Sequence, residues 1–137
     1  MIIDATDLIL GRMAAFAAKQ ALLGNEVHII NSEKAIITGG KKFLIDRYTQ
    51  RIHRGEPHHG PNFPRRPDIL VRRSIRGMLP YKQYKGESAF KRIKCYIGEP
   101  ESLKAGAISI ERAHKKNLKN TKFITILELS RHIGYKK

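Results

Sequence analysis

The sequence predicts a single domain of the α/β class that contains at least one pair of parallel strands. Two apolar runs, residues 1–5 and 27–31, have the length and the β-branched character of buried strands. Between them, apolar residues recur at helical spacing from Leu10 to Leu22, and Gly24 follows as a stop signal. A strand, a helix and a strand within about 30 residues form a βαβ unit with a right-handed crossover. The length of 137 residues is that of one domain.

Local signals predict how these first elements begin and end. Thr6 or Asp7 is expected to cap the helix, because short polar side chains accept hydrogen bonds from the free N–H groups of a first turn. The alanine-rich face of the helix would let it lie close to a sheet. Ser32 is expected to open a short turn or helix, and Gly39 and Gly40 form a hinge.

The middle of the chain is expected to hold two helices joined by a long exposed loop. The first helix is predicted over residues 41–51, and the loop over 53–67 contains two glycines, four prolines and no apolar period. The second helix begins at Pro67 or Asp68 and ends at Pro80. Its apolar side is expected to contain Ile69, Leu70, Val71, Ile75, Met78 and Leu79.

The last third of the chain gives weaker signals. A short helix is predicted over residues 88–92, followed by a strand over 93–97. Residues 99–122 are polar and lysine-rich, with little core signal. Thr125 and Glu128 have the spacing of a capping box for a last helix that runs to about Ile133. We expect one domain over 1–137, in which 99–137 is a C-terminal extension.

Positive charge is concentrated in the middle of the chain. The net charge is +15, and residues 41–94 hold fifteen basic residues against four acidic ones. From Phe43 to Tyr81 all eight cations are arginines. An arginine side chain can donate two parallel hydrogen bonds to one phosphate, and it can stack on a base. So much unbalanced charge predicts a polyanionic partner. The loop over 53–67 carries part of this charge, so we expect the loop to be mobile until it binds that partner.

Composition excludes several classes of protein. No apolar run approaches the roughly 20 residues of a membrane span, and no secretory signal is recognised. Cys95 cannot form an internal disulfide, which fits a reducing cytosol, and we expect it to be buried and inert. Aromatic residues are 7% of the chain and Trp is absent, which argues against a large stacking platform for single strands.

The sequence gives no support for a cofactor, a metal or a small-molecule substrate. The spaced glycines of a dinucleotide-binding loop are absent after the first strand, and Gly40-Lys41 lacks the Ser or Thr of a P-loop. His53, His58 and His59, together with Cys95, match no common zinc spacing. These histidines suit phosphate binding or base stacking, and no acid–base pair is fixed for catalysis.

The arginine segment favours folded RNA as the partner. The pattern of this segment predicts a helix, an irregular loop and a second helix. It contains no helix-turn-helix, zinc-finger or basic-zipper pattern. Such a loop can follow an irregular RNA surface, with contacts mainly to phosphate and sugar. Two hypotheses stand: a structural RNA-binding protein, or an RNA-modifying or RNA-cleaving enzyme whose basic groove holds the substrate.

Three motifs near the end of the arginine segment carry a family resemblance. Arg76-Gly77-Met78-Leu79-Pro80, Tyr84-Lys85-Gly86 and residues 93–98 closely resemble the signature of the thirteenth large-subunit ribosomal protein family. Residues 4–5, 10–14, 29–34 and 38–41 resemble other parts of that family in the same order. The resemblance covers about residues 1–98 and is closest to the archaeal branch.

The resemblance implies a three-layer α/β/α fold on a mostly parallel sheet. It further implies a non-catalytic constituent of the cytoplasmic large ribosomal subunit, which binds large-subunit rRNA beside neighbouring ribosomal proteins and acts in assembly. By matched motif, the implied RNA-facing residues are Arg12, Lys41, Lys42, Arg76, Lys82 and Lys85. Composition adds Arg47, Arg51, Arg54, Arg65, Arg66, Arg72 and Arg73. The flanking arginines add His58 and His59 as groups suited to phosphate or bases.

Gly77 is expected in the last turn of the second helix, where glycine lowers helix propensity relative to alanine. Two gains could offset that cost: close approach of the RNA backbone beside Arg76, or packing against a neighbouring element. The flanking Arg73 and Arg76 favour the first.

Overall fold

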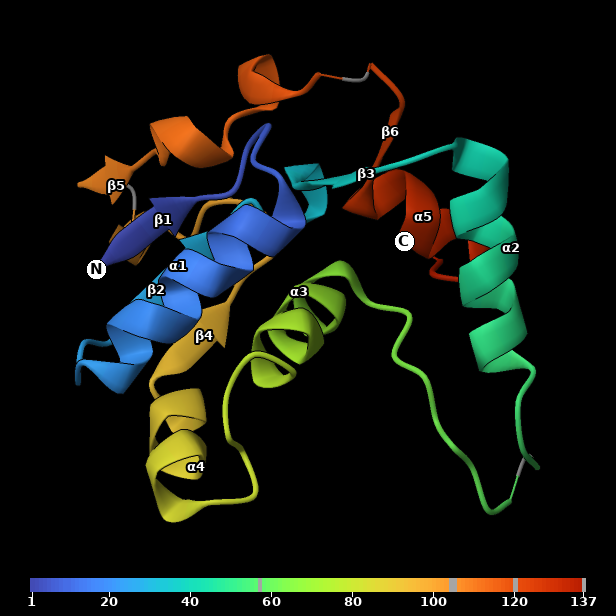
Figure 1. Cartoon of the computed structure of the whole chain (residues 1–137), viewed down its shortest axis with the longest axis horizontal. Helices are drawn as coiled ribbons and strands as arrows, with labels where there is room; N and C mark the ends of the chain where they lie inside the picture. The colour runs from blue at the N-terminus through green and yellow to red at the C-terminus, as the bar shows by residue number, and fades with distance from the viewer. Residues whose placement is uncertain (57, 104–105, 120, 137) are drawn as a thin grey trace.

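A four-stranded parallel sheet lies at the centre of the protein (Figure 1). The computed structural model describes residues 1–56, 58–103, 106–119 and 121–136. The strand order is β4-β2-β1-β5, and each neighbouring pair runs parallel. The strands are β1 (Ile2–Asp4), β2 (Val27–Ile30), β4 (Ile93–Cys95) and β5 (Ala107–Ile108). The predicted single α/β domain with a mostly parallel sheet is confirmed.

The predicted βαβ unit is formed by β1, α1 (Leu10–Leu22) and β2, with Ile3 paired to Ile29. The alanine-rich face of α1 is buried, and Ala14, Ala17 and Ala21 are fully inaccessible to solvent. Small side chains there let other elements approach the helix closely. Gly24, at a φ of +99°, ends the helix as expected, because glycine adopts this backbone conformation without strain.

The predicted cap of α1 is wrong. The N-cap is Ile9, and no side chain accepts a hydrogen bond there. Thr6 instead donates from its backbone N–H (3.0 Å) and its hydroxyl (2.7 Å) to Oδ1 of Asp4. Asp7 has a left-handed backbone, and its carboxylate pairs with Lys115 at 2.8 Å. Both polar residues therefore shape the turn between β1 and α1.

The two faces of the sheet are covered differently. On one face α1 packs with α3 (Pro67–Arg76) and α4 (Tyr84–Lys91), above the buried side chains of Ile3, Val27, Ile29 and Ile93. On the other face Ile2, His28 and Lys94 stand in register, and Lys94 is exposed. The connection from β4 to β5 crosses from one edge strand to the other, and a right-handed crossover carries it over this second face. Its described helical element is the 3-10 turn η2 (Glu101–Leu103), so this layer is thin.

A second, two-stranded sheet joins distant parts of the chain. The antiparallel strands are β3 (Ile36–Thr38) and β6 (Phe123–Thr125), neither of which the sequence predicts. The expected turn at Ser32 is the 3-10 turn η1 (Ser32–Lys34). After β6, helix α5 (Ile126–His132) begins where the capping box predicts, because the Thr125 hydroxyl accepts a hydrogen bond from the N–H of Glu128 at 3.2 Å.

The helix α2 (Lys41–Ile52) lies beside α5, at the end of the molecule away from the central sheet (Figure 1). The loop 53–66 then runs as an extended segment from α2 to α3. The turns η3 (Glu111–Ala113) and η4 (Lys115–Asn117) follow β5. Residues Ala113, Ile124, Ile126 and Leu129 are fully buried, so the C-terminal third contributes to the core.

The boundaries of the later elements differ from the sequence prediction. Helix α3 ends at Arg76 with Gly77 as its C-cap, before Pro80. Helix α4 begins at Tyr84, four residues earlier than expected, and β4 ends at Cys95. Ile69 and Met78 are 41% and 45% exposed, so the expected apolar side of α3 is narrower than predicted. Among the described residues, no helix has both the length and the apolar character needed to cross a membrane.

Candidate nucleic-acid interface

The cationic side of α3 consists of Arg72, Arg73 and Arg76, and each guanidinium lies over an aromatic ring. The distances from Cζ to the ring centroid are 4.5 Å for Arg72 over Phe90, 4.6 Å for Arg73 over Phe63 and 5.0 Å for Arg76 over Tyr81. The rings come from α4, the 53–66 loop and the turn after α3. Each such contact contributes about 0.5–1 kcal/mol at an exposed site. The contacts also favour one position of each guanidinium group in the absence of a ligand.

The same arrangement extends to α2 through one further ring, that of Tyr48. Cζ of Arg51 lies 5.4 Å from the centroid of the Tyr48 ring, and the Tyr48 and Phe63 rings meet edge to face at 5.7 Å. The aromatic residues of this region thus hold arginines in place. We call Arg51, Arg72, Arg73 and Arg76 the held arginines. Because each guanidinium packs against a ring, we expect less conformational entropy to be lost when these side chains bind a partner.

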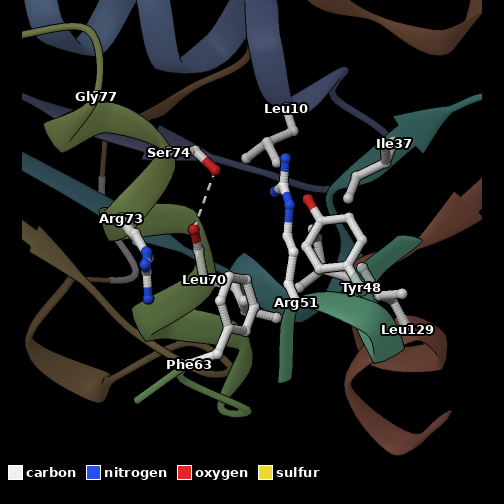
Figure 2. Close-up of a pocket in the computed structure, with 11 residues that line it drawn as sticks. Leu10, Ile37, Tyr48, Arg51, Phe63, Leu70, Arg73, Ser74, Gly77 and Leu129 are labelled. Atoms are coloured by element: carbon white, nitrogen blue, oxygen red, sulfur yellow. Dashed lines mark hydrogen bonds between the residues drawn. The ribbon is translucent and has the colours of Figure 1, made fainter. Parts of the chain in front are cut away.

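Figure 2 shows the cavity in which Arg51 lies, a space of about 220 Å³ between α1, α2, α3 and α5. The Arg51 side chain extends past Tyr48 toward Leu10, whereas Arg73 extends away on the other side of Phe63. Most of the lining is apolar, and no carboxylate is among the described residues that line the cavity. Ser74 is satisfied internally, since its hydroxyl donates to the Leu70 carbonyl at 3.1 Å. The positive charge of Arg51 is therefore not neutralised inside this cavity.

The loop arginines have different surroundings. Arg66 forms a two-point ion pair with Asp68, at 3.2 Å from Nε and 2.9 Å from Nη2, so its charge is already compensated. Arg54 and Arg65 line one hollow of about 380 Å³, together with Glu56. Two backbone hydrogen bonds between Glu56 and Gly60, at 3.2 and 2.8 Å, close the tip of the loop. Pro57 in this tip lies outside the described residues.

The remaining predicted RNA-facing residues are dispersed. Lys41 pairs with Glu128 of α5 at 2.9 Å, and Nη1 of Arg12 donates to the carbonyl of Arg112 at 3.0 Å. These two cations thus stand at different elements from the cationic side of α3. The others are exposed at the surface, on α2, in the 53–66 loop and around the start of α4: Lys42, Arg47, His58, His59, Lys82 and Lys85. Among the described candidates, the structure brings the held arginines together around α3, and it places Arg54 beside Arg65 and Lys41 beside Lys42 in separate hollows.

The geometry describes an ordered cationic surface, and comparison with known proteins identifies the family. A sequence model of the family described as Ribosomal protein L13 matches residues 1–102. The chain belongs to the ribosomal protein L13 family. The resemblance carried by the sequence motifs is confirmed.

Three archaeal relatives of this L13-family chain are named large ribosomal subunit protein uL13. The protein of Methanocaldococcus jannaschii is 46% identical over 98% of this chain and 98% of its own length. Those of Methanopyrus kandleri and Methanosarcina barkeri are each 44% identical over 98% of this chain, and over 86% and 98% of their own lengths. The similarity therefore continues into the C-terminal residues beyond 102. All three are named as ribosomal proteins, in agreement with the expectation of a non-enzymatic protein.

The polar groups at the carboxyl edge of the sheet in this L13-family chain bind one another. Asn31 is 2% exposed, and its amide donates to Asp4 at 3.1 Å and to Glu99 at 2.8 Å. Burial opposes ionisation of Asp4, but hydrogen bonds from Thr6 and Asn31 and the charge of Lys34 outweigh it, so the pKa of Asp4 is lowered. The carboxylate of Glu33 accepts from the N–H of Gly98 at 3.0 Å. Among the described residues, no group of three or more His, Cys, Asp or Glu side chains is placed to hold a metal ion.

The contacts of Cys95 and His28 are packing contacts and hydrogen bonds within the protein. Burial raises the pKa of the Cys95 thiol to about 12, so the thiol is protonated at neutral pH. Cys95 is only partly buried, so the expectation of a buried cysteine is not borne out, whereas its raised pKa agrees with a thiol of low reactivity. The His28 ring stacks on Tyr96 at 6.0 Å between centroids, and its Nδ1 lies 3.3 Å from the Tyr96 hydroxyl.

Sequence reasoning missed the aromatic partners of the arginines. Only Tyr48 and Arg51 show a local signal, because residues three apart lie on the same face of a helix. Phe63 and Phe90 meet Arg73 and Arg72 through tertiary contacts between separate elements. No sequence spacing indicates those two pairs.

Proposed function

We propose that this L13-family chain is a structural constituent of the large ribosomal subunit that binds large-subunit rRNA through the held arginines. Its place in the cell is then the cytoplasmic ribosome, with neighbouring large-subunit proteins as its other partners. By shaping and neutralising folded RNA, it would support assembly of the subunit. The names of its relatives support the subunit, and the chemistry of the surface supports the RNA.

The observation that carries the proposal is the set of four arginines that lie over aromatic rings and have no carboxylate in salt-bridge contact among the residues that the structure describes. Asp68 is engaged by Arg66, and Glu87 is engaged by Lys91 at 2.8 Å. The held arginines therefore keep their charge for an external anion. A guanidinium group can donate two parallel hydrogen bonds to one phosphate, and each phosphate contact releases counterions from the RNA.

Binding to transcribed large-subunit rRNA as a function of salt tests this assignment. One variant replaces Arg72, Arg73 and Arg76 with Gln. Its control replaces Lys19, Lys94 and Lys116 with Gln, which are exposed and lie on α1, β4 and η4. Both variants lose three positive charges, so a difference between them reports position and not net charge. Thermal unfolding of each variant checks that the fold is retained.

We expect the arginine variant to bind more weakly and to flatten the log–log salt slope by about 0.7 for each phosphate that it no longer neutralises. The lysine variant should stay close to the original protein. Equal effects of the two variants would assign binding to general charge and contradict the proposal. Washing large subunits in high salt gives a second test. An integral constituent stays bound, whereas an enzyme that binds the RNA transiently is removed.

A further inference from the structure

A second pocket, of about 370 Å³, opens on the outer side of α3, and we call it the α3 pocket. Its apolar walls are Phe63, Pro64, Ile69 and Phe90. Its polar lining is Asn62 and the three arginines of the cationic side of α3. The volume lies within the roughly 300–1,000 Å³ of ligand pockets, whereas the cavity at Arg51 is smaller than that range. No carboxylate is among the described residues that line the α3 pocket.

Ile69, like Met78, is an apolar residue that the helical pattern predicts in the core, but the structure leaves it 41% exposed. Its spacing from Arg72, Arg73 and Arg76 places it on the cationic side of α3. An exposed apolar side chain beside three cations is unfavourable in water and is not buried in the core. A ligand with an apolar part and a negative charge would cover Ile69 and pair with the arginines.

The walls of the α3 pocket are held in place without a ligand. The rings of Phe63 and Phe90 each lie against one arginine, and the Nε of Arg72 is buried with no acceptor among the described residues. Phe63 and Arg73 line both this pocket and the cavity that holds Arg51, which is the one drawn in Figure 2. The pocket therefore offers an apolar surface and cationic groups at fixed positions.

We propose that the α3 pocket takes one unstacked nucleotide of the large-subunit rRNA. The base lies against Ile69 and Pro64, and the flanking phosphates bind the arginines. A free phosphate or a duplex backbone has no apolar part to cover Ile69. Bases in RNA loops and bulges do, because they leave the stack and lie on aromatic rings or guanidinium planes. The inference rests on the proposed function and adds the kind of nucleotide that is bound.

The test fills the pocket without changing its charge. Ile69→Trp places a large ring in the pocket, and Met78→Trp is the matched control, because Met78 is 45% exposed and does not line the pocket. Phe90→Leu is a second variant, which removes the ring under Arg72 and keeps every charge. The measurements are the affinity for large-subunit rRNA across salt, thermal unfolding, and the position of ultraviolet crosslinks between protein and RNA.

We expect Ile69→Trp and Phe90→Leu to weaken binding by about tenfold, the order expected for loss of one stacked base, at an unchanged salt slope. The original protein and Met78→Trp should crosslink one nucleotide to Phe63 or Phe90, and Ile69→Trp should lose that crosslink. Original affinity in both pocket variants would overturn the inference and leave the proposed function standing. Intact RNA binding with loss of a large-subunit protein partner would assign the pocket to an acidic protein segment instead. An original protein that does not bind the rRNA would overturn both proposals.

Discussion

The guanidinium of Arg73 lies 4.6 Å from the centroid of the Phe63 ring, and this contact joins the 53–66 loop to α3. Nη1 of Arg73 also donates to the carbonyl of Asn62 at 3.4 Å. The loop is therefore attached to the folded body near its C-terminal end, while its tip at Glu56–Gly60 is closed by its own backbone. Its mobility in the free protein stays a prediction, and this attachment limits it to the residues before Asn62.

Replacing Phe63 with Leu tests this attachment. The variant keeps an apolar side chain but removes the ring that lies between Tyr48 and Arg73, so we expect rRNA affinity to fall several-fold. The free energy of unfolding should fall by about 1 kcal/mol, since the ring is partly buried. Phe43→Leu is the control, because Phe43 is 65% exposed and should change neither quantity. Urea unfolding and rRNA binding measure both, and unchanged affinity in Phe63→Leu would separate the loop from recognition.

The pair Arg65 and Arg66 should contribute less to RNA binding than its charge implies. Arg66 is held by Asp68 in a two-point ion pair, so only Arg65 has its charge uncompensated by such a contact. We expect the double change to Ala to flatten the salt slope by about 0.7, the value for one phosphate contact. A change near twice that value would show that RNA displaces Asp68 from Arg66. Asp68→Asn, which frees Arg66, should then strengthen binding at low salt.

Two glycines in the signature motifs should respond in opposite ways to alanine. A Cβ at Gly86 would overlap the carbonyl group of Pro80, so Gly86→Ala should destabilise the protein by about 1–3 kcal/mol. Gly77 is exposed, and a Cβ there would lie 3.5 Å from the Ser74 carbonyl oxygen, an ordinary contact. Gly77→Ala should leave the free energy of unfolding level or slightly higher.

The same Gly77→Ala variant should bind rRNA more weakly, because Gly77 lies beside Arg76 where the RNA backbone is expected to approach. Thermal unfolding and rRNA binding of the two variants give the comparison. A melting temperature several degrees lower for Gly77→Ala, with RNA affinity intact, would place this glycine in packing instead.

The Cys95 thiol should resist modification in the folded protein. Burial raises its pKa from 9.0 to about 12, so little thiolate exists at pH 8 and a thiol reagent should react slowly. The unfolded chain ionises near pH 9 and the folded chain near pH 12. The free energy of unfolding should therefore fall as the pH rises between these values. The difference from Cys95→Ala isolates this effect, and rapid labelling of folded protein at pH 8 would contradict it.

The elements that the sequence predicts well are those whose signals are local. The βαβ unit follows from apolar periodicity within the first 31 residues, and the start of α5 follows from the capping box at Thr125. The strands β3 and β6 are three residues each and pair across most of the chain, so no short window contains their signal. The local pattern therefore places Ile36 at the end of a turn.

The candidate site also has features that the sequence predicts and features that it does not. Residue type and charge predict arginines as the binding groups, because unbalanced charge is a property of composition. The exposure of Ile69 and Met78 is decided by which neighbours cover each side of α3, and helical spacing does not contain that information. The contacts of Arg72 with Phe90 and of Arg73 with Phe63 depend on the path of the chain between α2 and α4.

The pairing of β3 with β6 also governs the order in which the newly made chain can fold. Ile124, Ile126 and Leu129 complete the core, and they are synthesised after the arginine segment. Until then, the arginine segment has left the synthesising ribosome without its finished support. During that interval residues 41–94 already carry their excess of positive charge. The time between synthesis of the arginine segment and synthesis of β6 therefore sets how long the arginines lack their folded support.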